Sequence, residues 1–211
     1  YDVLLFDFFG TGDSEGDFAD ASIRAWRSDI DAVIRHMNPQ VRLHIVGFRA
    51  GAQIAVDAAS RHAVQSLTLV HPQLSGKQQL DEMLRLRLTA SLMGGGRERI
   101  SALRRRLLAG DTLEIAGYRL SPELASGLDA LALTGLSGSP PARVNCVEVV
   151  SEPTDEIRTG LQHAIDDWRS AGSIVNCETT QCGDFWATRE ISPCPALVDN
   201  IVDCLSSCAA T

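Results

Sequence analysis

The chain has 211 residues, of which 45% are hydrophobic and 22% charged, and its formal net charge is −8. A chain of this length and composition can bury one sizeable core and fold as a globular protein. The acidic balance excludes nucleic acid as the main partner, because binding a phosphate backbone needs a basic face. No apolar run approaches the roughly 20 residues that cross a bilayer, so we expect no membrane span.

Short apolar runs recur along the chain and alternate with stretches of helical periodicity. The runs with the length of a strand are residues 2–8, 41–46, 66–70, 144–150 and 173–178. This alternation is typical of a parallel sheet that helices cover on both faces. We therefore predict an α/β fold with a doubly wound, mostly parallel sheet. The first run begins without any lead-in, so we expect the natural protein to have further elements before it.

Two helical patterns accompany the early strands. Residues 20–37 place Ile23, Trp26 and Ile30 on one stripe at helical spacing, and Asp20 suits the N-cap position. Residues 49–62 are small and apolar, which favours a helix packed closely against a sheet. Both helices are therefore predicted to cover the sheet.

The alternation of strand-length apolar runs with helical patterns stops between residues 76 and 133. In this segment, helical patterns at 80–93 and 100–108 precede a turn-rich stretch, GDTLEIAGYRLSP. We expect a mainly helical cap over residues 74–138, inserted between core segments 1–73 and 139–211. Arginines cluster in this insertion among acidic neighbours, which predicts a solvated helix face. They are Arg97, Arg99, Arg104, Arg105 and Arg106, with Glu98, Asp111 and Glu114 beside them.

A glycine-rich turn, LLFDFFGTGDSEGDF, follows the first apolar run. Gly10 and Gly12 fit a dinucleotide fingerprint, but the third glycine comes one position late, at Gly16. Carboxylates also crowd the place where a pyrophosphate would need bare amides. We predict a plain turn and no cofactor.

The stretch VGFRAGA has the form of a nucleophile elbow, G-x-S-x-G, with Arg49 in place of the serine. It joins an apolar strand to a small-residue helix, which is the context that this motif requires. Gly47 and Gly51 would leave room for a strained turn, so Arg49 should point into a pocket at the carboxyl edge of the sheet.

Several segments together resemble the exosortase-A-associated hydrolases, a branch of the α/β-hydrolase superfamily, and most closely the branch called hydrolase 2. They are DFFGTGDSEGDFADAS, VGFRAGA, LVHPQLSGKQQLDEMLRLRL, AGYRLSPELASGLDAL and GDFWATREISPCPALV. The resemblance spans the whole chain and implies an α/β-hydrolase fold with a helical cap. It also implies that the first strands of the fold, and one loop that supplies an oxyanion-hole amide, are missing here. In this family, arginine at the elbow is the usual residue.

A serine hydrolase needs a nucleophile, a base that takes its proton and an acid that orients the base. Arg49 cannot be the nucleophile, because its guanidinium stays protonated and offers no lone pair. The acid would follow the strand at 144–150, where Asp155 is the best candidate. The base would follow the last strand, where Asp184 occurs but no histidine does. Arg49, Asp155 and Asp184 are thus the triad-equivalent positions, with two of the three roles vacant.

Other polar residues are weaker candidates. His71 ends a strand that does not ordinarily supply the base, and His44 lies inside a strand as a satisfied structural residue. Ser75 lies in an ordinary helix-start pattern, and Cys182 has no base beside it, so we predict neither to be a nucleophile.

An arginine at the elbow is suited to bind an anion through its planar fork of donors. The amides of Ala50 and Gly51, at the start of the next helix, would face the same place. A carboxylate or phosphate group could be held there. Equally open is an internal salt bridge from Arg49 to Asp155 or Asp184, which would leave the site silent.

All six cysteines lie in the last third of the chain: Cys146, Cys177, Cys182, Cys194, Cys204 and Cys208. A chain of this size can bury a core without disulfides, so we expect free thiols and a cytoplasmic location. Cys204 and Cys208 would share one helix face, but no C-x-x-C pair occurs, and we expect no metal.

The favoured function is an α/β-hydrolase-fold protein that acts on or binds an acyl or ester compound. The resemblance places that compound in an exopolysaccharide or protein-sorting pathway. The alternative is a catalytically silent anion-binding or scaffold protein. The expected partners are a small-molecule or acyl substrate and, as an open alternative, a second copy of the chain.

Overall fold

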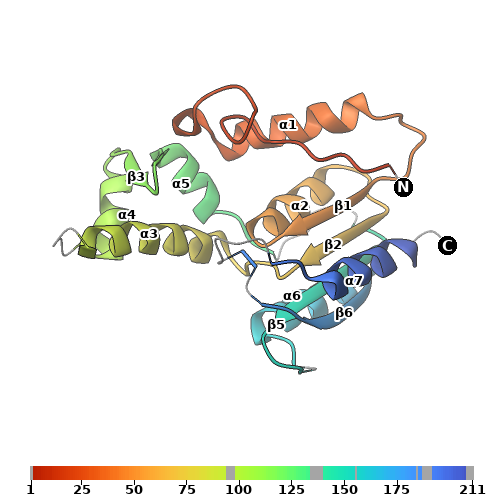
Figure 1. The fold of residues 1–211 in the computed structure, drawn as a ribbon. Helices are drawn as coiled ribbons and strands as arrows, with labels where there is room; N and C mark the ends of the chain where they lie inside the picture. The colour runs from red at the N-terminus through yellow and green to blue at the C-terminus, as the bar shows by residue number, and fades with distance from the viewer. Residues whose placement is uncertain are drawn as a thin grey trace. The chain divides into compact units, whose positions relative to one another are not determined.

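The computed structural model describes residues 2–93, 98–133, 140–154, 156–183, 185–186 and 192–207. The chain divides into two compact units: the first comprises Tyr1–Pro39 and Ser75–Leu131, and the second Gln40–Leu74 and Ala132–Thr211. Figure 1 labels most of the helices and strands. Among the helices of the described ranges, none combines the length and the apolar character that crossing a bilayer requires.

Within the described residues of the second unit, four strands form one parallel sheet in the order β1-β2-β5-β6 (Figure 1). They are β1 (His44–Phe48), β2 (Ser66–Val70), β5 (Arg143–Val150) and β6 (Ile174–Gln181). The register is continuous, because His44 lies beside Ser66, Ser66 beside Arg143, and Arg143 beside Ile174. The parallel sheet confirms the predicted α/β fold.

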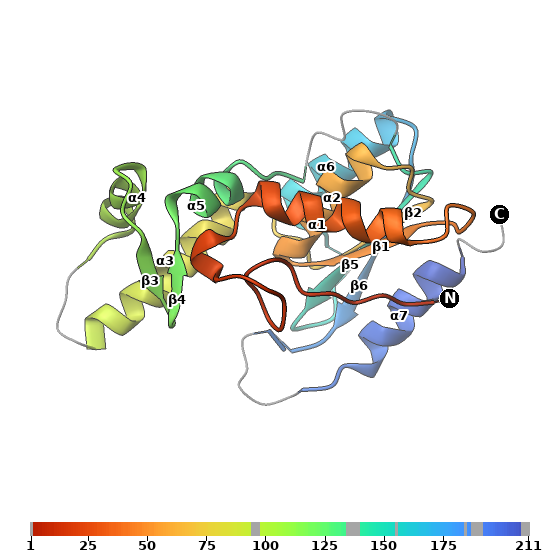
Figure 2. The same ribbon diagram turned by 90° about the horizontal axis from the view of Figure 1, so that it is seen from above.

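Helices cover both faces of this sheet (Figure 2). Helices α2 (Ala50–Arg61) and α6 (Thr159–Ser170) lie on one face, and α7 (Pro195–Ser206) lies on the other. Strand β5 shows the alternation. Val144 and Cys146 pack into the core with α2 and α6, whereas Val147 and Val149 pack into the core with α7. A strand buried on both faces reads as a continuous apolar run, which is why the sequence predicts it well.

The first unit is mainly helical. It contains η1 (Phe18–Asp20), α1 (Ile23–His36), α3 (Gly76–Met93), α4 (Ile100–Leu108), the antiparallel hairpin of β3 (Leu113–Ile115) and β4 (Tyr118–Leu120), and α5 (Pro122–Asp129). Glycines allow close approach to α5: a Cβ on Gly127 would lie 2.8 Å from the Cγ1 of Ile23, and one on Gly76 would overlap the carbonyl oxygen of Leu128. Larger residues there would force these segments apart.

Two arginines of α4 pair with acids of the same unit. Arg104 contacts Asp81 and Asp129, each at 2.8 Å, and Arg106 contacts Glu98 at 3.2 Å and Asp111 at 2.9 Å. Arg106 thus pairs with two of the acids that the sequence places beside the cluster, whereas Arg104 pairs with acids of α3 and α5 and does not lie on a solvated face. Arg97 lies outside the described residues.

Residues 2–8 correct one prediction, because the structure gives them no regular secondary structure. Val3 is 80% exposed and Leu5 is 91% exposed. An apolar pattern favours a strand locally, but a strand exists only through hydrogen bonds to a neighbour, and none pairs with this segment in the described residues. The predicted strand at 2–8 is therefore wrong.

Two further differences concern the first unit. The N-cap of α1 is Ser22, whose hydroxyl accepts from the Ala25 amide at 3.1 Å, while the predicted cap, Asp20, ends the preceding 3-10 turn. Both residue types cap helices well, so the sequence could not choose between them. The stretch expected to be only turn-rich folds into the β3–β4 hairpin, closed by Ala116 and Gly117, which both have positive φ.

Candidate functional site

The backbone of Arg49 has the strained geometry of an elbow. This residue lies between β1 and α2 with φ 48° and ψ −114°, a conformation that residues with a side chain rarely adopt. Its amide donates to the Val70 carbonyl at 2.9 Å, and its carbonyl accepts from the Gln73 amide at 3.2 Å. The elbow is therefore fixed to the end of β2.

Gln53 also stabilises this turn. Its side chain is buried, and its Nε2 donates to the Gln73 carbonyl at 3.1 Å. A buried amide needs such a partner, and here the partner belongs to the residue that holds the elbow. Gln53 was not predicted; a lone glutamine in the apolar helix pattern at 49–62 is the signal that could have found it.

The two glycines of the motif are not equivalent. A Cβ added to Gly47 would lie 2.7 Å from the Ala52 Cα and 2.8 Å from the Ala55 Cβ, so only glycine lets α2 pack this closely on β1. A Cβ added to Gly51 would meet nothing within 4 Å. The tight turn therefore requires Gly47 but not Gly51, which corrects the equal role that the sequence suggested.

The Arg49 side chain lies against an indole. Its guanidinium carbon is 4.5 Å from the ring centroid of Trp186, which follows β6. This distance is that of a cation–π contact, worth about 0.5–2 kcal/mol. Arg49 also takes part in further interactions, so it is not a free cation.

His71 stacks on the same indole. Its ring centroid lies 4.6 Å from that of Trp186, with 23° between the ring planes. His71 directly follows β2 and, like Arg49, has a positive φ, of 40°. Its amide donates to the Val147 carbonyl at 2.7 Å, which fixes it to β5. Residues in strained conformations at the ends of two adjacent strands thus meet at one aromatic ring.

An ion pair with a buried carboxylate lies beside His71. The Glu148 carboxylate, on β5, is 3% exposed, and its Oε1 is 3.4 Å from the Nδ1 of His71. Arg158, at the start of α6, contacts the same carboxylate through Nε and donates from Nη2 to Oε2 at 3.0 Å. The Arg158 Nη2 also donates to the Pro72 carbonyl at 2.8 Å.

The charge of Glu148 is set by two opposing effects. Burial raises the pKa of Glu148, because a carboxylate loses hydration in the interior, and the Arg158 guanidinium lowers it again through a hydrogen bond and charge attraction. The net direction is upward from its ordinary value. Arg158 is therefore the partner that makes a buried carboxylate tolerable here.

The structure describes three of the five predicted site residues. Arg49 stands at the elbow, and Ala50 and Gly51 begin α2 directly after it. Asp155 and Asp184 lie outside the described residues. The structure adds Trp186 to the neighbourhood of Arg49, in the segment where a base would be expected.

His71, Glu148 and Arg158 were not predicted as site residues. Glu148 interrupts the apolar run VNCVEVV, and an acid inside a doubly buried strand is a signal that the sequence offered. In the sequence, His71 follows a strand that does not ordinarily supply the catalytic base, so the pattern does not indicate it. The contacts among these side chains depend on the order of the strands in the sheet. A local sequence pattern does not contain that order, so it could not predict the contacts.

The cysteines correct another expectation. Cys182 and Cys194 are joined by a disulfide, with 6.1 Å between their Cα atoms, whereas we expected only thiols. The chain returns to the end of β6 before α7 begins, which brings the two together. Cys182 is thereby removed as a candidate nucleophile.

Three other cysteines, Cys146, Cys177 and Cys204, carry no disulfide. A hydrogen bond between the Cys146 and Cys177 thiols raises the pKa of Cys146 and lowers that of Cys177. Cys208 lies outside the described residues, so the predicted face shared with Cys204 is not described. Within the described ranges, no three His, Cys, Asp or Glu side chains gather so that they could hold a metal ion.

The glycine-rich turn is closed on itself. Gly10, Gly12 and Gly16 all have positive φ, and the Asp7 carboxylate accepts from the Asp13 amide at 3.0 Å. Helix α1 begins only at Ile23. The turn thus uses its own carboxylates as acceptors, as expected for a plain turn.

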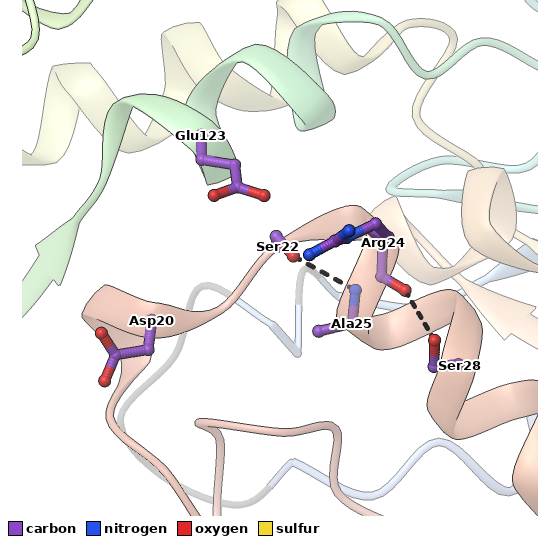
Figure 3. Close-up of a pocket in the computed structure, with 6 residues that line it drawn as sticks. All are labelled: Asp20, Ser22, Arg24, Ala25, Ser28 and Glu123. Carbon is purple, nitrogen blue, oxygen red and sulfur yellow. Dashed lines mark hydrogen bonds between the residues drawn. The ribbon is translucent and has the colours of Figure 1, made fainter.

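A shallow depression of about 360 Å³ opens at the start of α1 (Figure 3). Asp20, Ser22, Arg24, Ala25, Ser28 and Glu123 line it. Its hydroxyls already serve the helix: Ser22 caps it, and Ser28 donates to the Arg24 carbonyl at 3.2 Å. The depression is therefore a feature of the helix start and offers no paired nucleophile and base among these residues.

Known proteins resemble the chain in structure but not in sequence. No model of a protein family matches, and no curated protein matches. The α/β-hydrolase GrgF from Penicillium sp. sh18 aligns over 98% of this chain and 80% of its own, with 14% identity and a TM-score of 0.55. Est1E from Butyrivibrio proteoclasticus aligns over 91% of this chain and 73% of its own, with 15% identity and a TM-score of 0.55. The chain therefore has the α/β-hydrolase fold, and at these identities the likeness extends to the fold alone.

Proposed function

We propose that this α/β-hydrolase-fold protein binds an acyl or ester compound that carries an anionic group, and that Arg49 holds that group. One observation carries the proposal: the elbow conformation of Arg49, with its guanidinium against Trp186. In folds of this kind, ligands bind beyond the carboxyl ends of the strands. Arg49 directly follows the carboxyl end of β1.

The chemistry of arginine supports binding rather than serine-type hydrolysis. A guanidinium stays protonated, so it can neither attack a carbonyl carbon nor accept a proton. It can donate two parallel hydrogen bonds to a carboxylate. The first amides of α2, on Ala50 and Gly51, belong to a helix N-terminus, which favours a negative charge.

The alternative is a catalytically silent scaffold on the same fold, in which Arg49 is neutralised by Asp155 or Asp184. Because Arg49 already has other interactions, an incoming anion would have to compete with them. Binding measurements decide between the two proposals, since a saturated guanidinium would show no preference for an anionic ligand.

The finer parts of the proposal come from the resemblance to the exosortase-A-associated hydrolases. We place the acyl compound in an exopolysaccharide or protein-sorting pathway, and the protein in the cytoplasm, with a homodimer as an open alternative. A cap over residues 74–138 is part of the same proposal. Cell fractionation is a direct test of the location.

The test compares butyrate with butyramide, its neutral analogue, by titration calorimetry. We expect butyrate to bind the wild-type protein more tightly than butyramide. Arg49→Met should weaken butyrate binding by about 10- to 100-fold, the equivalent of losing a hydrogen bond to a charged group. Equal binding of the two ligands, or an unchanged affinity in Arg49→Met, would refute the proposed role of Arg49.

A second measurement tests the absence of serine-type chemistry. The protein should turn over p-nitrophenyl butyrate no faster than the Arg49→Ala variant, and a serine-directed fluorophosphonate should not label it. Fluorophosphonate labelling that blocks ester turnover would show a working nucleophile and contradict the proposal.

A further inference from the structure

We propose that Glu148 and Arg158 are positioning residues of the Arg49 site: their ion pair, of which the Glu148 carboxylate is buried, holds His71 against Trp186, the ring on which the Arg49 guanidinium lies. This inference rests on the proposed anion binding by Arg49. It concerns residues of the second unit only.

The ion pair of Glu148 and Arg158 is rigid. Arg158 engages both carboxylate oxygens of Glu148 and donates to the Pro72 carbonyl at 2.8 Å. A two-pronged contact of this kind fixes the plane of both groups. Strand β5, the start of α6 and the segment after β2 are thereby joined at one point.

Glu148 also contacts the His71 imidazole. The Glu148 Oε1 lies 3.4 Å from the His71 Nδ1. Nδ1 makes no hydrogen bond to the carboxylate at this distance, so the contact is electrostatic, and the negative charge favours the tautomer with its proton on Nδ1. We therefore expect neutral His71 to carry its proton on Nδ1.

Trp186 connects the His71 imidazole to the Arg49 side chain. His71 stacks on Trp186 at 4.6 Å, and the Arg49 guanidinium lies 4.5 Å from the same ring. When the His71 imidazole is fixed, the Trp186 indole that stacks on it has one orientation, and the Arg49 guanidinium can pack against it in only one way. The orientation of Arg49 thus depends on groups that do not touch it.

Stability alone does not explain the pair. Replacing both members of a buried ion pair by apolar residues is often neutral or stabilising, whereas removing one member leaves an uncompensated charge. Position 148 lies in a strand whose inner residues are buried and otherwise mostly apolar, where a hydrophobic side chain would fit the pattern. A carboxylate at this position therefore contributes little to stability, and we relate it to the orientation of His71.

The test is the double variant Glu148→Met with Arg158→Met. We expect it to unfold at the wild-type urea concentration, but to bind butyrate at least about tenfold more weakly, the size of loss found when supporting groups of other sites are removed. The ¹⁵N spectrum of His71 should change from the Nδ1–H tautomer to a mixture, and the indole N–H resonance of Trp186 should shift. Wild-type affinity together with unchanged His71 and Trp186 spectra would overturn the inference.

Arg158→Lys covers the case in which the double variant does not fold. It keeps the charge but not the planar fork, so the protein should fold while the His71 spectrum and the affinity both change. If both stay at wild-type values, the inference is overturned. As a matched control, the exposed pair of Asp166 and Arg169 on α6, changed to Asn and Gln, should leave the affinity within about twofold.

The two proposals fail in different ways. If wild-type protein does not bind butyrate, the proposed function fails, while the His71 and Trp186 spectra of the variants still report on positioning. If the wild type binds and the double variant binds equally well, only the positioning role fails.

Discussion

The strained backbone of Arg49 predicts that glycine will be more stable than alanine at this position. Arg49 has φ 48° and ψ −114°, a region in which a residue with a Cβ costs on the order of 1–3 kcal/mol. Arg49→Gly and Arg49→Ala both remove the contact with Trp186, so that loss cancels in the comparison. Glycine loses about 0.5–1 kcal/mol more than alanine in backbone entropy on folding. The difference in unfolding free energy should therefore be about 1 kcal/mol in favour of glycine.

Urea unfolding, followed by far-UV circular dichroism, measures this difference. Ser60, within α2, is the matched control. There, alanine should be more stable than glycine by about 1 kcal/mol, the usual order in a helix. If alanine is also the more stable residue at position 49, Arg49 does not adopt the elbow conformation, and the reasoning about its orientation fails.

Three further predictions follow from other parts of the second unit. Gly47→Ala should destabilise the protein by about 1–3 kcal/mol through overpacking, whereas Gly51→Ala should be neutral or stabilising by up to about 1 kcal/mol; equal effects in urea unfolding would contradict the close packing of α2 on β1. Burial and the nearby Arg42 charge lower the pKa of His44, so the unfolded chain takes up a proton more readily, and stability should fall as the pH drops below about 6.5; thermal unfolding of His44→Gln should show a weaker decline. Alkylation of unfolded, unreduced protein should label Cys146, Cys177 and Cys204 but neither Cys182 nor Cys194, and labelling of Cys182 and Cys194, detected by mass spectrometry, would exclude the bond.

Local pattern was enough to predict most of the sheet. Strand β2 occupies the predicted residues 66–70, and the other strands of the sheet lie within a few residues of their predicted positions. Strands β2 and β5 are buried on both faces, so their sequences are largely apolar runs that can be recognised without knowledge of their neighbours, whereas β1 and β6 are partly exposed. The segment 2–8 has the same composition, yet it is not a strand, because the ladder partner that would make it one is not a local property.

The elbow was also visible in the sequence, although its details were not. The strand, the two glycines and the small-residue helix predicted the turn around Arg49. Only the coordinates showed that Gly47 is required for close packing and Gly51 is not. Spacing records where glycine occurs, whereas the distance from each Cβ position to the nearest atom decides whether glycine is needed.

By itself, the sequence determined the parallel α/β core and the presence of a permanent cation at the elbow, because periodicity and side-chain chemistry are local. The tertiary structure alone decided which groups surround that cation. His71, Glu148, Arg158 and Trp186 come from four separate places in the chain and meet only because β1, β2, β5 and β6 lie in that order. Strand order and register are set by contacts between distant segments, so the neighbours of Arg49 could not be predicted from any single stretch of the sequence.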